Sequence, residues 1–136
     1  MSPDFLTLEE VLEIHDDQVN RYGGSSGIRD FGLLESALVQ PQTIFGGSLL
    51  HTDLFEMAAA YFFHIIQNNP FMDGNKRVGA VAALVFLEIN NKTVIMTNDE
   101  LESQVLSVAQ GLTNKTASAK FFREHEVEII AVIIFA

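Results

Sequence analysis

The chain consists of stretches in which apolar residues recur every three or four positions, separated by short polar turns, which is typical of a helical domain. The first stretch, TLEEVLEIHDDQVNRYG, places Thr7 three residues before Glu10. This spacing predicts a capping box at the start of a helix, and the two glycines that follow predict its end. A shorter helix is predicted through Leu33 and Leu38. It should close before Pro41, because a proline disfavours helix in the residue ahead of it.

Two longer apolar segments follow, on either side of a short polar loop. Thr52 or Asp53 is predicted to cap the first segment, DLFEMAAAYFFHIIQNN, which should end at or near Asn69 because Pro70 comes next. The second segment, GNKRVGAVAALVFLEINN, carries no charge over residues 78–87. Helices that are apolar on most faces are usually buried. We therefore predict that the second helix runs through the middle of the domain.

Two further amphipathic helices and two connecting segments complete the predicted fold. PQTIFGGSLLH predicts a flexible loop or a small hairpin, and KTVIMTNDE predicts a short extended piece that ends in a second capping-box pattern, Thr97 with Glu100. The helices NDELESQVLSVAQG and NKTASAKFFREHEV follow. The Ile- and Val-rich ending VEIIAVIIFA is compatible with a strand, a helical turn or a tail buried by a partner. We predict one all-α domain over residues 1–136, a helical bundle with a buried central helix.

Composition narrows the functional classes. A chain of 136 residues has the length of one domain and can bury a core without covalent staples. The absence of cysteine excludes disulfides and thiolate metal sites. The acidic start MSPDFLTLEE is not a secretory leader, and no apolar run reaches the roughly 20 residues of a membrane helix, so we expect a cytoplasmic protein without a membrane partner. The net charge of −10 argues against direct nucleic-acid binding.

The densest polar cluster, QNNPFMDGNKRVG at residues 67–79, lies directly before the most apolar segment. The first amides of a helix that begins at about Gly74 have no partner within the helix, and their partial positive charge favours an anion. Gly74 lets a phosphate approach the backbone closely, and Asn75 offers two amide donors. Lys76 adds a mobile charge, and Arg77 adds a fork suited to phosphate oxygens.

Asp73, just before this helix, can either cap it or hold a hard cation such as Mg²⁺. Taken singly, each residue of the cluster is more often part of a solvated turn. Two cations in a first turn oppose the helix dipole, however, so helix stability does not explain Lys76 and Arg77, whereas a bound anion does. We therefore interpret the cluster as a site for the phosphates of a nucleotide, with Phe71 as an apolar anchor of the loop.

The segment NPFMDGNKR resembles the Fic motif, whose usual form is His-Pro-Phe-x-Asp-Gly-Asn-(Gly/Lys)-Arg. Lys76 in place of Gly resembles the death-on-curing (Doc) branch, the toxins of toxin–antitoxin pairs. Three longer segments also look like that branch: FLTLEEVLEIHDDQVNRYGG, IRDFGLLESALVQP and LFEMAAAYFFHIIQNNPFMDGNKRVGAVAALVFLEINN. The resemblance covers most of the chain, to about Asn114. It implies the all-helical Fic fold and the transfer of part of a nucleoside triphosphate to a protein hydroxyl.

Carried onto this chain, the resemblance makes Asp73 the Mg²⁺ ligand. It makes Gly74, Asn75 and Lys76 the cradle of the ATP phosphates, with Arg77 as a further phosphate contact, and it makes TIFGG the flap that aligns the acceptor. Most Fic proteins transfer the nucleotidyl group, whereas Doc-like toxins transfer the terminal phosphate to a translation factor, and Lys76 favours the second chemistry. The implied partners are a host translation protein and a short, Phd-like antitoxin that folds on the toxin.

Asn69 departs from the family pattern, because it stands where the family has its catalytic His. That His acts as the general base, and Asn cannot take a proton from the attacking hydroxyl. We therefore expect nucleotide binding to persist and transfer to be slowed by about 10²–10⁴-fold. The chain is either a deliberately disabled toxin or a natural pseudoenzyme that binds a nucleotide or an antitoxin. A nucleotidyl-transferring Fic protein and a plain helical scaffold are the further alternatives.

No other histidine is an obvious substitute for the missing base. His64 precedes Asn69 by five residues, which places it about 140° around the helix, and its apolar neighbours indicate a core position. His15, His51 and His125 are distant in the sequence, and we expect them at the surface. The run HDDQ that contains the first of them is interpreted as a solvated helix face.

Overall fold

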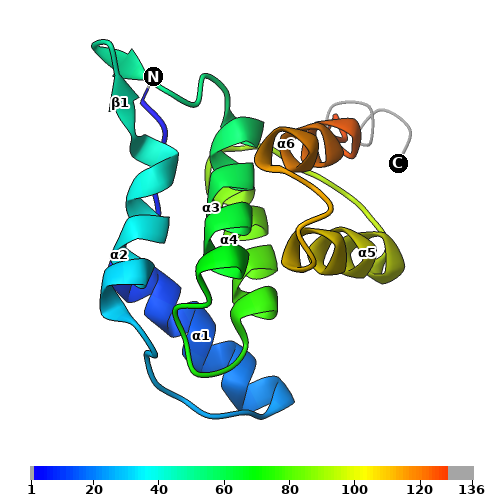
Figure 1. Cartoon of the computed structure of the whole chain (residues 1–136). Helices are drawn as coiled ribbons and strands as arrows, with labels where there is room; N and C mark the ends of the chain where they lie inside the picture. Colours follow the sequence, from blue (N-terminus) through cyan, green and yellow to red (C-terminus); the bar gives the residue numbers. More distant parts are fainter. Residues whose placement is uncertain (1, 129–136) are drawn as a thin grey trace.

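Six α-helices and one small hairpin make up the part of the chain that the computed structural model describes, residues 2–128 (Figure 1). No helix in this range combines the length and the apolar composition needed to cross a membrane. The predicted all-α fold is confirmed. In chain order the elements are α1 (Leu8–Tyr22), α2 (Phe31–Val39), the 3-10 helix η1 (Gln40–Gln42), β1 (Ile44–Phe45), β2 (Ser48–Leu49), α3 (Leu54–Asn68), α4 (Asn75–Ile89), α5 (Asn98–Ala109) and α6 (Lys115–Glu124).

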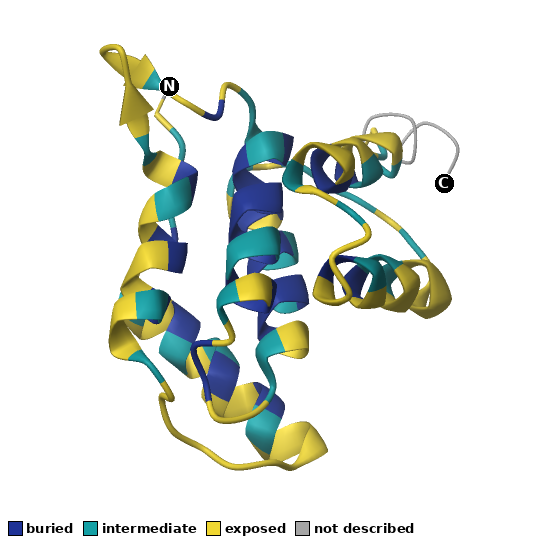
Figure 2. Cartoon of the chain, viewed as in Figure 1, coloured by how far each residue is buried: buried dark blue, intermediate teal, exposed yellow. Residues whose placement is uncertain are grey.

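The core lies around α3 and α4, which are joined by a short loop. Helix α2 covers one side of α3 and α6 the other, while α1 packs across α4 (Figure 1). Nine of the fifteen residues of α3 are buried and seven of the fifteen in α4, and Figure 2 shows the buried residues gathered on these two helices. The predicted buried central helix is therefore present, but two helices share that position and α3 is the more enclosed.

Gly79 allows these two central helices to approach closely. A Cβ atom at this position would lie 2.8 Å from Cγ1 of Ile66 and 3.2 Å from the carbonyl oxygen of Phe62, both on α3. Contacts this short would force the helices apart. The glycine therefore sets the spacing between α3 and α4, whose joined ends carry the polar cluster of residues 67–79.

Side-chain caps fix most helix starts as the sequence predicts. The two predicted capping boxes, at Thr7 and Thr97, are both present. Asp53 caps α3, and its carboxylate accepts a hydrogen bond from the amide of Glu56. In contrast, α4 begins after Gly74, which has no side chain to cap the helix. Its first amides are therefore left for another acceptor.

The predicted loop or hairpin around residues 43–49 is an antiparallel hairpin, in which residues 44–45 pair with 48–49. Both glycines of its turn have positive φ, 61° and 83°, a region that glycine enters readily. The side chains of Ile44 and Phe45 are 68% and 77% exposed. The hairpin therefore extends beyond the core and contributes little to it.

Helix α6 packs against α3, α5 contacts both α3 and α4, and the residues after α6 are tied to the extended piece between α4 and α5. Val94 forms an isolated antiparallel bridge with Glu126, and the amide of Val127 donates to the carbonyl of Thr93 at 2.8 Å. The predicted extended piece is thus confirmed, and it lies against the residues that follow α6. Residues 129–136, most of the Ile- and Val-rich ending, lie outside the described residues.

His125 joins the end of α6 to the start of α5, so it is not the free surface residue that the sequence suggested. Its Nδ1 donates to the carbonyl of Phe121 at 2.7 Å and its Nε2 to the carboxylate of Glu100 at 2.8 Å. Only the protonated ring has two N–H donors. The pKa of His125 is accordingly raised, mainly by the hydrogen bond to Glu100 and next by the one to Phe121. The pKa of Glu100 is lowered to about 2, mainly by the hydrogen bond from the backbone amide of Thr97.

We expect His125 to stabilise the fold in a pH-dependent way. Because the folded pKa is raised, its contribution is complete below the unfolded pKa of about 6.5 and is lost as the pH rises through the folded value. The free energy of unfolding, measured by urea denaturation at about pH 5.5 and about pH 9, should fall more with pH in the original chain than in His125→Gln. Equal pH dependence in the two proteins would contradict this prediction.

Candidate functional site

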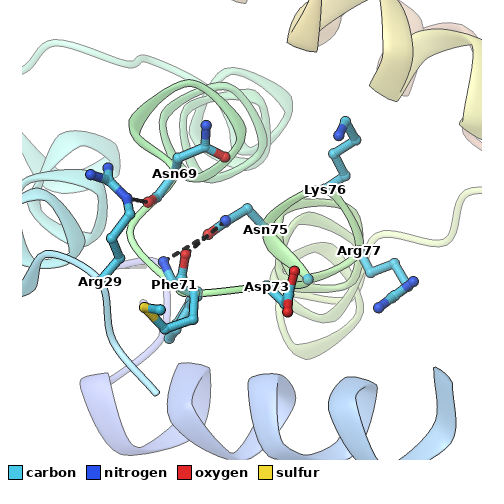
Figure 3. Close-up of a pocket in the computed structure, with 9 residues that line it drawn as sticks. Arg29, Asn69, Phe71, Asp73, Asn75, Lys76 and Arg77 are labelled. Carbon is cyan, nitrogen blue, oxygen red and sulfur yellow. Dashed lines mark hydrogen bonds between the residues drawn. The ribbon is translucent and has the colours of Figure 1, made fainter. Parts of the chain in front are cut away.

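The loop between α3 and α4 forms one wall of an open pocket of about 460 Å³. Figure 3 shows Asn69 and Arg29 at one end of this pocket and Lys76 and Arg77 at the other, with Asn75 between them. All six site residues predicted from the sequence line it together. The complete lining consists of Arg29, Asn69, Phe71, Met72, Asp73, Gly74, Asn75, Lys76 and Arg77.

Asn69 lies at the end of α3, as Pro70 predicts, and at the rim of the pocket. It is the C-cap residue, and its amide donates to the carbonyl of Ile65 at 3.3 Å. Its φ of 49° places it in the left-handed region, where Asn and His are both enriched among residues other than glycine. Either side chain is therefore compatible with this backbone.

The start of α4 faces the pocket with unpaired amides. The first backbone hydrogen bond of this helix runs from the amide of Val78 to the carbonyl of Gly74 at 2.9 Å. Within residues 2–128, the amides of Asn75, Lys76 and Arg77 have no hydrogen-bond acceptor. Three free amides at the positive end of a helix dipole can bind an anion.

The side chain of Asn75 also has a part in the loop that the sequence did not predict. Its Oδ1 accepts a hydrogen bond from the amide of Phe71 at 2.8 Å, and its Nδ2 donates to the carbonyl of Phe71 at 3.0 Å (Figure 3). These two bonds close the loop on itself. The backbone amide of Asn75 and the second N–H of its Nδ2 are left for an anion in the pocket, while the rest of the side chain keeps the loop in shape.

Three cationic side chains line the pocket of a protein whose net charge is −10. Lys76 and Arg77 were predicted, and both are exposed. Arg77 lies over the ring of Tyr22, 5.3 Å from its centroid, and donates to the carbonyl of Gly23 at 3.3 Å. Arg29 was missed, because it is 40 positions from Asn69 and no local motif marks it.

Within the described residues, none of the three cations that line the pocket forms an ion pair. Four of the chain's eight basic residues form ion pairs within residues 2–128, and none of these four lines the pocket. Asp73 is the acidic residue of the lining. The pocket therefore carries a surplus of positive charge, which favours an anionic ligand with more than one charge. The four paired residues are Arg21, Lys92, Lys120 and Arg123.

Asp73 does not cap α4, which was one of its two predicted roles. Its Oδ2 accepts a hydrogen bond from the amide of Ser25 at 2.8 Å. Gly24 comes so close that a Cβ atom there would lie 3.1 Å from Cβ of Asp73. The exposed carboxylate therefore keeps a fixed orientation beside the pocket and retains an oxygen that a cation could use. No group of three or more His, Cys, Asp or Glu suited to a metal ion occurs within residues 2–128.

His15 lies beneath the loop, and the prediction that it is a surface residue is wrong. It is 3% exposed, and its ring stacks on Phe71 with centroids 4.0 Å apart and planes 9° from parallel. Its Nε2 donates to the carbonyl of Asp73 at 2.9 Å. Phe71 itself is 1% exposed, so the predicted apolar anchor is confirmed. Of the run HDDQ, His15 and Gln18 are buried, and only the two aspartates form a solvated face.

The remaining two histidines lie against α6 and away from the pocket. His51 is 6% exposed, so it is also not the surface residue that was expected. His64 is half-buried, and its Nε2 accepts a hydrogen bond from Nζ of Lys115 at 3.1 Å. Burial, followed by the charge of Lys115, lowers the pKa of His64 to about 4. His64 is therefore neutral near pH 7, and no histidine is among the described residues that line the pocket.

Taken together, the pocket can hold a polyanion, but its lining, within the described residues, includes no histidine. The free amides and the cations attract phosphate-like oxygens, and the Asp73 carboxylate can share a hard cation with them. Asn69 can orient a hydroxyl by hydrogen bonding, but it cannot deprotonate it.

Comparison with known proteins gives a consistent picture. The Fic/DOC family model matches residues 5–87. A protein named "Protein kinase doc", from Escherichia phage P1, is 31% identical over 115 residues, which cover 85% of this chain and 90% of that protein. A second relative, "Toxin Doc" from Mycolicibacterium smegmatis, is 39% identical over 69 residues, or 51% of this chain and 53% of that protein. The family match includes α1, residues 24–30 and the whole lining of the pocket.

Proposed function

The chain belongs to the Fic/DOC family, and from this premise we propose that it is a Doc-like toxin whose pocket binds ATP with Mg²⁺. In this proposal it transfers the terminal phosphoryl group to a hydroxyl of a host translation protein. The transfer is strongly slowed because Asn69 replaces the general base. The observation that carries the proposal is the surplus of positive charge, with three free helix amides, in one pocket of an acidic protein.

The residues of the pocket fit a triphosphate bound through its oxygens. The amides at the start of α4 suit one phosphate, and Lys76 and Arg77 reach the same pocket from the first turn. The glycine at position 74 adopts a positive φ of 81°, which a larger residue would adopt only under strain. Backbone and side chains therefore converge on one anionic ligand.

Asp73 fits the role of the protein carboxylate that holds Mg²⁺. Magnesium is commonly bound by one or two carboxylates together with the phosphates of the substrate, and Asp73 is an exposed carboxylate at the pocket whose orientation is fixed by the Ser25 amide. When bound, the ion neutralises phosphate charge and orients the group that is transferred. Ser25 contacts Asp73 through its backbone amide, so Ser25→Ala should have little effect on Mg²⁺ binding.

The group that is transferred is proposed to be the terminal phosphoryl group. The phage P1 relative carries the name of a protein kinase, which supports phosphoryl transfer, as does Lys76 in the motif. The alternative is transfer of a nucleotidyl group. Mass spectrometry of the modified protein distinguishes the two, because the added masses differ.

The second candidate function is a pseudoenzyme that binds a nucleotide or an antitoxin without catalysis. Asn69 is the observation that favours it, because the pocket otherwise retains its charge and shape. In either case we propose a short Phd-like antitoxin as partner and the cytoplasm as the location.

Nucleotide binding is expected to stabilise the fold measurably. At a ligand concentration about 100 times its Kd, Mg-ATP should raise the free energy of unfolding by about 2.7 kcal/mol. The measurement is thermal or urea denaturation with and without Mg-ATP. Lys76→Met and Arg77→Met should each weaken the effect, because they remove phosphate contacts.

Lys120→Met is the matched control, since Lys120 is an exposed cation on α6 that does not line the pocket. It should leave the stabilisation by Mg-ATP unchanged. If Mg-ATP at millimolar concentrations does not stabilise the protein, both the toxin and the nucleotide-binding pseudoenzyme are ruled out, which leaves an antitoxin-binding pseudoenzyme or a helical scaffold.

A further inference from the structure

Arg29 makes a two-point contact with the end of α3. Its Nε donates to the carbonyl of Asn69 at 2.6 Å, and its Nη2 donates to the carbonyl of Asn68 at 2.9 Å. The last carbonyls of a helix have no partner within the helix. A planar guanidinium matches two neighbouring oxygens at once, which the single ammonium of a lysine does not.

The backbone around Arg29 is anchored to the same loop. The amides of Arg29 and Asp30 both donate to the carbonyl of Pro70, at 2.7 and 3.0 Å, and Ile28 forms an antiparallel bridge with Phe71. The side chain of Arg29 therefore starts from a fixed point beside the loop. Its guanidinium closes the turn at position 69 through the carbonyls of Asn68 and Asn69.

Position 69 needs such support because its backbone is unusual. It combines a left-handed φ of 49° with a single helical hydrogen bond, from its amide to Ile65 at 3.3 Å. The residue is also exposed and followed by a proline, so no packing of its own side chain holds it. Without the guanidinium, its carbonyl and that of Asn68 would be free to turn toward water.

We propose that Arg29 is a positioning residue for position 69, and that it holds the side chain there at the angle from which it meets the acceptor hydroxyl. This inference rests on the proposed function, because the orientation matters only if position 69 takes part in transfer. Arg29 acts through residue 69 and does not bind the phosphates. Figure 3 shows it at the end of the pocket away from Lys76 and Arg77.

The first experiment uses the chain as it stands and needs no activity. Arg29→Lys and Arg29→Met are compared with the original protein and with Lys120→Met by NMR. In both Arg29 variants the amide of Asn69 should exchange with solvent about 10-fold faster or more, and the carbon shifts of residue 69 should move away from left-handed values. Unchanged exchange and shifts in Arg29→Met would overturn the inference.

The second experiment measures transfer in a protein that also carries Asn69→His. Adding Arg29→Lys or Arg29→Met should lower kcat by about 10- to 100-fold, the range typical of lost positioning contacts, while the KM for ATP stays within about twofold. A general loss of stability would not give this separation of kcat from KM. Two results contradict the inference: full kcat with Arg29→Lys, or a raised KM with kcat unchanged, which would make Arg29 a ligand of the nucleotide.

The two experiments separate failure of the inference from failure of the proposed function. If Asn69→His alone transfers nothing although it folds, the proposed transfer is wrong, and the NMR comparison then decides by itself whether Arg29 fixes position 69. If Asn69→His is active and the Arg29 variants keep its kcat, the function stands and the positioning role falls.

Discussion

Asn69→His is expected to raise the rate of transfer from ATP to a host protein by about 10²–10⁴-fold, the usual contribution of a general base. The rest of the pocket needs no change, because its cations, its free amides and Asp73 are already gathered there. The left-handed backbone at position 69 is a conformation in which histidine, like asparagine, is enriched among residues other than glycine. The side chain is at the exposed rim, so the larger ring does not disturb the core.

The measurement is labelling of a translation extract with ATP, followed by mass spectrometry of the modified protein. Growth arrest on expression is a second readout. The rate should rise with pH through about 6.5, the ordinary pKa of histidine, because a general base acts in its neutral form. Asn69→Gln is the control: it also replaces Asn69 by a longer side chain but supplies no proton acceptor, and it should stay as slow as the original. A folded, harmless Asn69→His that labels nothing would refute the proposed transfer.

Phe71→Ala is expected to destabilise the protein by about 3–5 kcal/mol, the range for loss of a fully buried phenylalanine. Phe71 is 1% exposed and stacks on the buried ring of His15. Its backbone amide donates to the Asn75 side chain and its carbonyl accepts from it. Loss of the ring therefore frees the loop that places the amides proposed to bind the phosphates, and binding of Mg-ATP should be lost even under conditions where the protein remains folded.

Urea denaturation and ligand-induced stabilisation test the two parts of this prediction. Phe45→Ala is the matched control, because it removes the same side chain from a position that is 77% exposed, where a substitution usually changes stability by less than about 0.5 kcal/mol. Phe71→Leu should recover much of the stability, since it refills most of the space. If Phe71→Ala binds Mg-ATP normally, then the loop does not depend on its anchor and the account of the site is wrong.

The helices and the pocket loop could be predicted from local sequence. Capping boxes at Thr7 and Thr97, the proline after Asn69 and the glycines near the hairpin act over a few residues, so their effects are visible without the fold. The predicted site residues could be identified for the same reason. They all lie in the nine-residue segment NPFMDGNKR, which forms a loop and the start of the helix that follows it.

The contacts that hold this loop could not be predicted in the same way. His15 and Arg29 lie 58 and 40 positions from their partners Asp73 and Asn69. The polar residues next to His15 did not indicate that its imidazole ring is buried beneath the loop. Arg29 had no neighbouring signal that would distinguish it from other exposed basic residues. The sequence also did not show that the side chain of Asn75 closes the loop through two hydrogen bonds with Phe71.

The sequence by itself determined the helical class, the positions of the helix ends and the chemistry available between residues 69 and 77, because hydrogen bonding at caps and turns is a property of adjacent residues. Only the tertiary structure decided which distant groups support that chemistry. Packing of α1 and of residues 24–30 against the loop places His15 under it, Ser25 on Asp73 and Arg29 on the end of α3. Such contacts depend on how whole elements pack, and no local spacing encodes them.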